Sequence, residues 1–394
     1  MRTILIKNTI SLILLTLTLI SCNSPAYISG RLEGIEKKDI KIYLIEPETL
    51  GEVAASYFGK VIDSALVNSD GSFEFHNPPK TENPVLLELV VQQPGKAPNY
   101  LQTDDPIRSN YMPVIWQPGE LLQITAQTDN LQQSFLIEHP SEMNKALLDL
   151  RDISARAYQT NLAGKHWELE VESQLLEKED AILQYQTQLI KFADSTQYLL
   201  PALVAFRWVS PENDYERVPE FLVNQCNKWS REQPDHPWVE QLCEESDPSN
   251  LPVLLGDVFP NLRFPLLTKD TLSLRDLVGD KLTIIDLWAS WCAPCRKENR
   301  EVLVPIWNEY HDKGLRIVAY ALESDENTWK AAAENDGANQ WIQASDLLGD
   351  DAPFLKKIRV QTIPANFILD DKGVVIAKNV HGVALMDLVK SYIQ

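Results

Sequence analysis

The chain has 394 residues, with 56 acidic and 36 basic side chains and a formal net charge of −20 at pH 7. Its length exceeds what one core usually organises and its 44% hydrophobic content is normal for globular structure, so several folded domains are expected. The acidic balance argues against binding to nucleic acid and against direct adhesion to anionic lipid headgroups.

Residues 1–21 are predicted to be a lipoprotein signal peptide. Arg2 and Lys7 precede an apolar run over residues 10–20, which is shorter than the roughly 20 residues that a membrane-spanning helix needs. The run ends in Leu-Ile-Ser-Cys, which resembles a bacterial lipobox and implies cleavage before Cys22 and lipidation of its thiol. A plain signal peptide followed by an unrelated cysteine is the alternative. The preferred interpretation is a periplasm-facing lipoprotein of the cell envelope, anchored to the membrane at Cys22.

Residues 22–140 are predicted to form a small antiparallel β domain. Short β-rich runs alternate with turn signals such as Ser69-Asp70-Gly71 and Gln117-Pro118-Gly119. The runs cover residues 41–45, 61–62, 72–75, 85–91 and 121–124. The sequence of this region has no nucleophile, metal-binding cluster or glycine-rich loop that would indicate an activity of its own.

Residues 141–250 are predicted to form a helical module that ends in a linker at residues 246–252. Apolar residues recur there at helical spacing, for example Met143, Leu147 and Leu150. Residues 22–140 carry 16 acids and 8 bases, residues 141–250 carry 20 and 10, and residues 251–394 carry 20 and 16. The acidity therefore belongs to the first two regions, where solubility explains it better than steering of a partner.

Two of the five cysteines, Cys226 and Cys243, lie in the helical module and have no role in lipidation or redox chemistry. In an oxidising compartment, two such thiols in one helical region suggest a structural disulfide. Two buried free thiols are the alternative, because spacing in the sequence does not prove proximity.

Residues 251–394 are predicted to be an α/β domain. Apolar β-rich runs at 282–288, 315–322, 365–369 and 373–380 alternate with helical stretches near 293–312, 326–336 and 384–393.

Cys292-Ala-Pro-Cys295 follows the first of these strands and opens a helix. The unpaired N–H groups and the dipole at a helix N-terminus favour a thiolate at Cys292, which is therefore the expected nucleophile and should be exposed. Cys295, one turn further, should be shielded and able to close a disulfide with Cys292. Half of a zinc site and an ordinary structural disulfide are weaker alternatives. No second Cys-x-x-Cys exists in the sequence, so no metal is expected.

Two carboxylates are placed to handle protons. Asp286 lies in an apolar run, so it should be buried, and desolvation would raise its pKa toward the range of a general base. Glu298 lies one turn beyond Cys295 on the same helix face. A solvated Glu298 that pairs with Arg296 or Lys297 is the alternative, and which carboxylate acts as the base stays open.

The segment 286–298 resembles thioredoxins, and specifically the membrane-tethered TlpA/ResA-like thiol–disulfide oxidoreductases. The resemblance extends over residues 251–394, and residues 362–368 resemble the cis-proline loop and following strand of that fold. It implies a thioredoxin-like fold with a cis bond before Pro364, and a substrate-binding surface that includes Trp291, Ile363 and Pro364. Asp286 matches the buried aspartate of thioredoxins, and Glu298 matches a glutamate of ResA-like proteins.

The function that the resemblance implies is disulfide exchange with envelope proteins, with reduction as the expected direction. Apocytochromes c are one implied substrate, a membrane thiol transporter is the implied electron donor, and no cofactor beyond the cysteine pair is expected. A peroxiredoxin-like peroxidase is an alternative, but Ala289 stands where such enzymes generally place a threonine or serine. A binding lipoprotein with an accessory redox domain is the other alternative.

Overall fold

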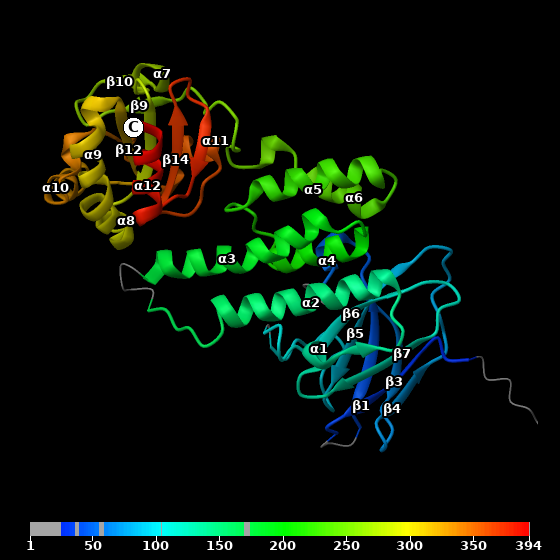
Figure 1. Ribbon diagram of the computed structural model, residues 1–394. Coiled ribbons are helices and arrows are strands. Elements are labelled where there is room, and N and C mark those ends of the chain that lie inside the picture. The colour runs from blue at the N-terminus through cyan, green and yellow to red at the C-terminus, as the bar shows by residue number, and fades with distance from the viewer. Residues whose placement is uncertain (1–24, 36–38, 55–58, 104, 169–173, 394) are drawn as a thin grey trace, which may run out of the picture.

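The computed structural model describes residues 25–35, 39–54, 59–103, 105–168 and 174–393. The predicted signal peptide and Cys22 lie outside these residues. Figure 1 shows a β-rich part at the start of the chain, a layer of helices in the middle, and an α/β part that contains the C-terminus.

The β-rich part consists of two four-stranded sheets, with strand orders β4-β1-β7-β8 and β3-β2-β5-β6. Its pairings are antiparallel, as expected, except that β1 and β7 run parallel. All four strands of the second sheet lie between β1 and β7 in the sequence, so the connection between these two strands is a long crossover. The strands are β1 (Ile28–Glu33), β2 (Lys41–Glu46), β3 (Lys60–Leu66), β4 (Ser72–Phe75), β5 (Val85–Gln92), β6 (Tyr111–Trp116), β7 (Leu122–Gln127) and β8 (Leu136–Ile137).

The helices of the middle layer pack directly on these sheets. Asn144 of α2 accepts a hydrogen bond from the N–H of Ile115 in β6 at 2.9 Å and donates to its carbonyl at 2.7 Å. One continuous apolar core extends from Tyr27 to Leu242, so the sheets and helices form a single packed body. The helices are α1 (Leu131–Ser134), α2 (Glu142–Asn161), α3 (Gln174–Ser195), α4 (Leu199–Val209), α5 (Pro219–Glu232) and α6 (Pro237–Glu245).

A disulfide joins Cys226 of α5 to Cys243 of α6, with the two Cα atoms 5.0 Å apart. The bridge closes a short loop between two helices that already pack on the shared core.

Replacing both Cys226 and Cys243 by serine should lower the free energy of unfolding, because closing a loop of this length contributes about 3 kcal/mol in the chain-entropy model. Denaturant unfolding of the full chain measures the loss. Reduction of insulin disulfides should be unchanged, because neither cysteine makes a hydrogen bond or a disulfide with the described residues of the redox domain. An unchanged free energy of unfolding, or two free thiols at these positions in peptide mapping of the oxidised protein, would contradict the expectation.

The C-terminal part has its own apolar core, which extends from Phe259 to Ile393, and a five-stranded sheet of order β13-β12-β11-β14-β15. Strands β11, β12 and β13 are parallel, and β14 and β15 are antiparallel to their neighbours. This is the α/β fold that the sequence predicts. The strands are β9 (Arg263–Pro265), β10 (Thr271–Ser273), β11 (Leu282–Trp288), β12 (Leu315–Ala321), β13 (Ile342–Ala344), β14 (Ala365–Asp370) and β15 (Val375–Lys378).

The predicted helix over residues 293–312 is divided by a π-helical turn, Asn299–Leu303, between α8 and α9. The extra residue in such a turn re-aims the side chains that follow it. No helix in the part of the chain that the structure describes is long and apolar enough to cross a membrane. The helices of this domain are α7 (Leu274–Leu277), α8 (Ala293–Glu298), α9 (Val304–Tyr310), α10 (Glu326–Asn335), α11 (Pro353–Ile358) and α12 (Gly382–Ile393).

Candidate active site

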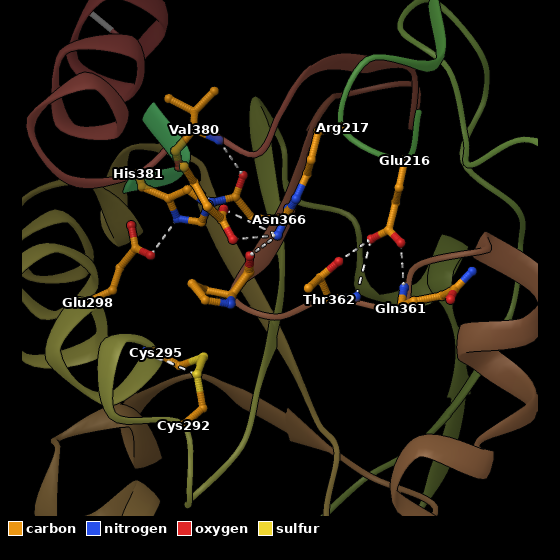
Figure 2. A network of polar contacts seen from close by, with 12 residues as sticks. Glu216, Arg217, Cys292, Cys295, Glu298, Gln361, Thr362, Asn366, Val380 and His381 are labelled. Atoms are coloured by element: carbon orange, nitrogen blue, oxygen red, sulfur yellow. Dashed lines mark hydrogen bonds and ion pairs between the residues drawn. A yellow bond between two sulfur atoms is a disulfide. The ribbon is translucent and has the colours of Figure 1, made fainter. Parts of the chain in front are cut away.

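The cysteine pair lies where the central strand β11 passes into helix α8. Cys292 is the N-cap residue of α8, and its Sγ accepts a hydrogen bond from the N–H of Cys295 at 3.4 Å. The two cysteines form a disulfide with their Cα atoms 5.3 Å apart (Figure 2). Pro294 fits the first helical turn because it has no N–H to leave unpaired. In the reduced state this N–H group and the helix dipole would favour a thiolate on Cys292.

Both cysteines are buried in this disulfide state, at 5% exposure for Cys292 and 3% for Cys295. The expectation of an exposed Cys292 is therefore wrong for the oxidised protein. The reason is that its sulfur turns toward Cys295 and the first turn of α8. Trp291, at 63% exposure, instead offers the apolar surface beside the pair.

The turn that leads into Cys292 is held by a residue that the sequence analysis missed. Glu323, which follows β12, is buried and accepts a hydrogen bond from the N–H of Ser290. Since β12 is the parallel neighbour of β11, the carboxyl ends of both strands meet here. Glu323 therefore helps to position the turn before the nucleophile.

Asp286 is buried in the middle of β11, opposite Asn366 of β14. Burial raises the pKa of its carboxyl well above the usual value, and the negative charge of Glu298 adds to the increase. No hydrogen bond holds this carboxyl among the residues that the structure describes. Asp286 therefore has the burial and the raised pKa that the sequence predicts.

Glu298 is buried rather than solvated. Its Oε2 atom lies 2.6 Å from Nδ1 of His381, and its Oε1 atom accepts a hydrogen bond from the N–H of Gly382 at 3.1 Å. A carboxylate at Glu298 accepts this hydrogen bond in the tautomer of His381 that carries its proton on Nδ1. Nε2 of His381 is buried without a partner among the described residues.

The ion pairs expected for a solvated Glu298 are absent from the described residues, because its cationic neighbours have other partners. Arg296 binds Asp336, the C-cap residue of α10, at 2.7 Å, and Lys297 lies 3.9 Å from Glu301. The two basic residues of α8 therefore pair with Asp336 and Glu301, and Glu298 is available to bind His381 and Gly382.

His381 could not be identified from the sequence because it lies 83 residues from Glu298. Its position depends on Asn366, whose side chain donates to the carbonyl of Val380 at 2.6 Å and accepts from the N–H of Val380 at 3.0 Å. Figure 2 shows His381 facing Glu298 above the cysteine pair. A single histidine before a C-terminal helix has no local pattern that would reveal such a partner.

The peptide bond between Ile363 and Pro364 is cis, as the resemblance implies. Pro364 is buried and Ile363 is half-buried at the start of β14. Strand β14 runs antiparallel to β11, with Ala365 opposite Leu287, so the loop that precedes β14 lies beside the end of β11, which the cysteine pair follows. The described residues hold no group of three or more His, Cys, Asp or Glu side chains that could bind a metal ion.

Comparison with known proteins places this domain among redox proteins. A family model described as Redoxin matches residues 254–386. The chain is 31% identical over 120 residues to the thioredoxin-like protein YneN of Bacillus subtilis, covering 30% of this chain and 68% of that protein. It is 30% identical over 137 residues to the thiol:disulfide interchange protein DsbE of Pseudomonas fluorescens, covering 33% and 68%. It is 27% identical over 144 residues to the thiol-disulfide oxidoreductase ResA of Bacillus cereus, covering 36% and 77%.

Proposed function

Because the chain belongs to the thioredoxin-like thiol–disulfide oxidoreductases, we propose that it reduces disulfides of proteins in the bacterial cell envelope through Cys292 and Cys295. The observation that carries the proposal is the position of the cysteine pair at the start of α8, directly after strand β11. Strand β14, which follows the cis bond before Pro364, is the neighbour of β11. That arrangement combines a stabilised thiolate with a neighbouring loop that can receive a substrate chain.

The reaction starts when the thiolate of Cys292 attacks one sulfur of the substrate disulfide. A bond forms between the two proteins, and the second substrate sulfur leaves as a thiolate that takes up a proton. Cys295 then gives its proton to Asp286 and attacks the sulfur of Cys292, which breaks the bond between Cys292 and the substrate. The first substrate sulfur leaves as a thiolate and also takes up a proton. The products are a reduced substrate and the disulfide between Cys292 and Cys295. Two electrons have moved to the substrate, and a membrane thiol donor must return two electrons to the pair.

The sequence supports a place for this reaction outside the cytoplasm. The signal peptide and the lipobox-like tetrad lead us to propose export and a lipid anchor at Cys22. Substrates would be envelope proteins with disulfides that must be opened, such as apocytochromes c before haem attachment.

Intact-mass measurement of membrane-extracted protein, quenched in acid and alkylated, tests both the direction and the anchor. A reductant should be recovered mostly with two alkyl groups, on Cys292 and Cys295, and with a lipid-modified N-terminus at Cys22. A pair recovered mainly as the disulfide would indicate an oxidant. An unmodified thiol at Cys22, or a retained Met1, would remove the anchor from the proposal.

A further inference from the structure

The segment just before and within the first turn of α5 joins the helical layer to the redox domain. The carboxylate of Glu216 accepts hydrogen bonds from the N–H groups of Gln361 and Thr362, each at 3.2 Å, and from the Thr362 hydroxyl at 2.9 Å. Arg217 donates to the carbonyl of Pro364 at 3.3 Å. Figure 2 shows Glu216 and Arg217 reaching the loop from the side opposite Glu298.

These contacts lie on both sides of Ile363 and leave Ile363 itself open. No described residue makes a hydrogen bond with its N–H or its carbonyl, and its side chain is half-buried. Backbone groups without partners at the end of a strand can pair with an added extended segment. The loop is therefore fixed at its ends and available at its centre.

Arg217 also connects the loop to helix α3, because it lies 3.3 Å from Glu179. Both partners of this ion pair are mostly shielded, at 24% and 29% side-chain exposure. An ion pair with little solvent access and a planar guanidinium holds its geometry better than an exposed one. Helix α3 and the loop are thus connected through one arginine.

A second contact docks the same segment elsewhere on the redox domain. Glu220 lies 2.7 Å from Nζ of Lys378 on the edge strand β15, and it accepts a hydrogen bond from the N–H of Leu255 at 2.9 Å. The Lys378 side chain is only 6% exposed. Of these two docking contacts, the one made by Glu216 and Arg217 touches the loop before Pro364 and the one made by Glu220 does not.

We propose that Glu216 and Arg217 are positioning residues that hold residues 361–364 ready to pair with an extended disulfide-bearing segment of a protein substrate. The inference rests on the proposed function and narrows its substrate class. A small disulfide needs only the thiolate of Cys292, whereas a polypeptide also needs the backbone of Ile363. The helical layer thereby favours polypeptide disulfides over small ones.

Steady-state kinetics of the full chain with insulin and with glutathione disulfide test this inference. Glu216→Gln should lower the ratio of kcat/KM for insulin to kcat/KM for glutathione disulfide about tenfold, mainly through KM, since it weakens several charge-assisted hydrogen bonds. Arg217→Gln should act in the same direction, and Arg217→Lys should restore part of the ratio.

Glu220→Gln is the matched control, because it makes the same chemical change four residues away without touching the loop. It should leave the ratio within about twofold, because the loop is untouched and a glutamine oxygen can still accept hydrogen bonds from Leu255 and Lys378. Thr362→Val, at an exposed position, removes only the hydroxyl contact and should produce a smaller loss than Glu216→Gln without threatening the fold.

An equal effect of Glu216→Gln on both substrates, no effect on either, or faster insulin reduction would each overturn the inference. The last result would mean that the helical layer shields the loop. A wild-type protein that reduces neither disulfide would instead refute the proposed function. A wild-type protein that reduces both, with variants that keep the ratio, would refute only the positioning role.

Discussion

The Cys295→Ser protein should accumulate mixed disulfides with its natural partners, whereas Cys292→Ser should accumulate almost none. Cys292 caps helix α8 and receives the N–H of Cys295, so it is the sulfur whose thiolate the helix stabilises. Without Cys295 the covalent complex has no resolving thiol, and its lifetime should increase from transient to isolable. Non-reducing electrophoresis of envelope extracts, followed by identification of the attached proteins, measures the outcome.

Cys292→Ser is the matched control, because it removes the attacking sulfur and keeps the same side-chain size. Equal trapping by the two variants would show that the assignment of nucleophile and resolving thiol is wrong. Selective alkylation of Cys295 in the reduced protein at mildly acidic pH would lead to the same conclusion. The identity of the trapped proteins also defines the substrate class.

Asp286→Asn should slow disulfide exchange near neutral pH by roughly 100-fold, because it removes a buried proton acceptor from the resolving step. Glu298→Gln is the comparison, and it should have a smaller effect because both Glu298 oxygens are already engaged by His381 and Gly382. Rates measured between pH 5 and 9 for both variants decide between them. A larger effect of Glu298→Gln would make Glu298 the base, and unchanged profiles in both variants would make both carboxylates structural.

The raised pKa of Asp286 also has a consequence for stability. The folded protein holds this proton more firmly than the unfolded chain does, so the stability that protonation contributes is lost as pH rises through the folded-state pKa. Above that pH the buried charge lowers the free energy of unfolding. Across a series from pH 4 to pH 9, the difference in melting temperature between Asp286→Asn and the wild type should therefore be smallest at pH 4 and should shift in favour of Asp286→Asn as the pH rises. If Asp286→Asn lowers the rate of disulfide exchange and raises the melting temperature in this pH-dependent way, Asp286 acts as a proton acceptor. A residue that only packs in the core would not show both effects.

The sequence was sufficient where the signal is local. An apolar run predicts both the strand before Cys292 and the burial of Asp286. Pro294 and the position of Cys292 directly after that run predict the start of the helix, and all of these signals lie within about 15 residues. The cis bond before Pro364 required the family resemblance, because a strand-start proline alone does not determine its isomer. Strand β1 was missed because Ile28–Glu33 contains glycine and two charges, and only pairing with β4 and β7 makes it a strand.

The missed site residues depend on contacts that are distant in the sequence. Three pairs form hydrogen bonds only because separate elements pack together. The pairs are Glu298 with His381, Ser290 with Glu323, and Thr362 of the loop before Pro364 with Glu216. The alternative that Glu298 pairs with Arg296 or Lys297 considered only helical spacing. It did not include His381 and Gly382 at the start of α12, which contact the Glu298 carboxylate in the folded chain. The burial of Cys292 has a local origin instead, because in the oxidised protein its sulfur is bonded to Cys295.

The separation of the two apolar cores has a consequence for how this protein can change over evolutionary time. The core that ends at Leu242 and the core that begins at Phe259 share no buried residue, and the polar contacts of Glu216, Arg217 and Glu220 lie outside both cores. Substitutions of Glu216 and Arg217 can alter which proteins reach the cysteines without removing a side chain from either core or changing the chemistry of the pair. A lineage can therefore adapt the preference of the enzyme separately from its reactivity.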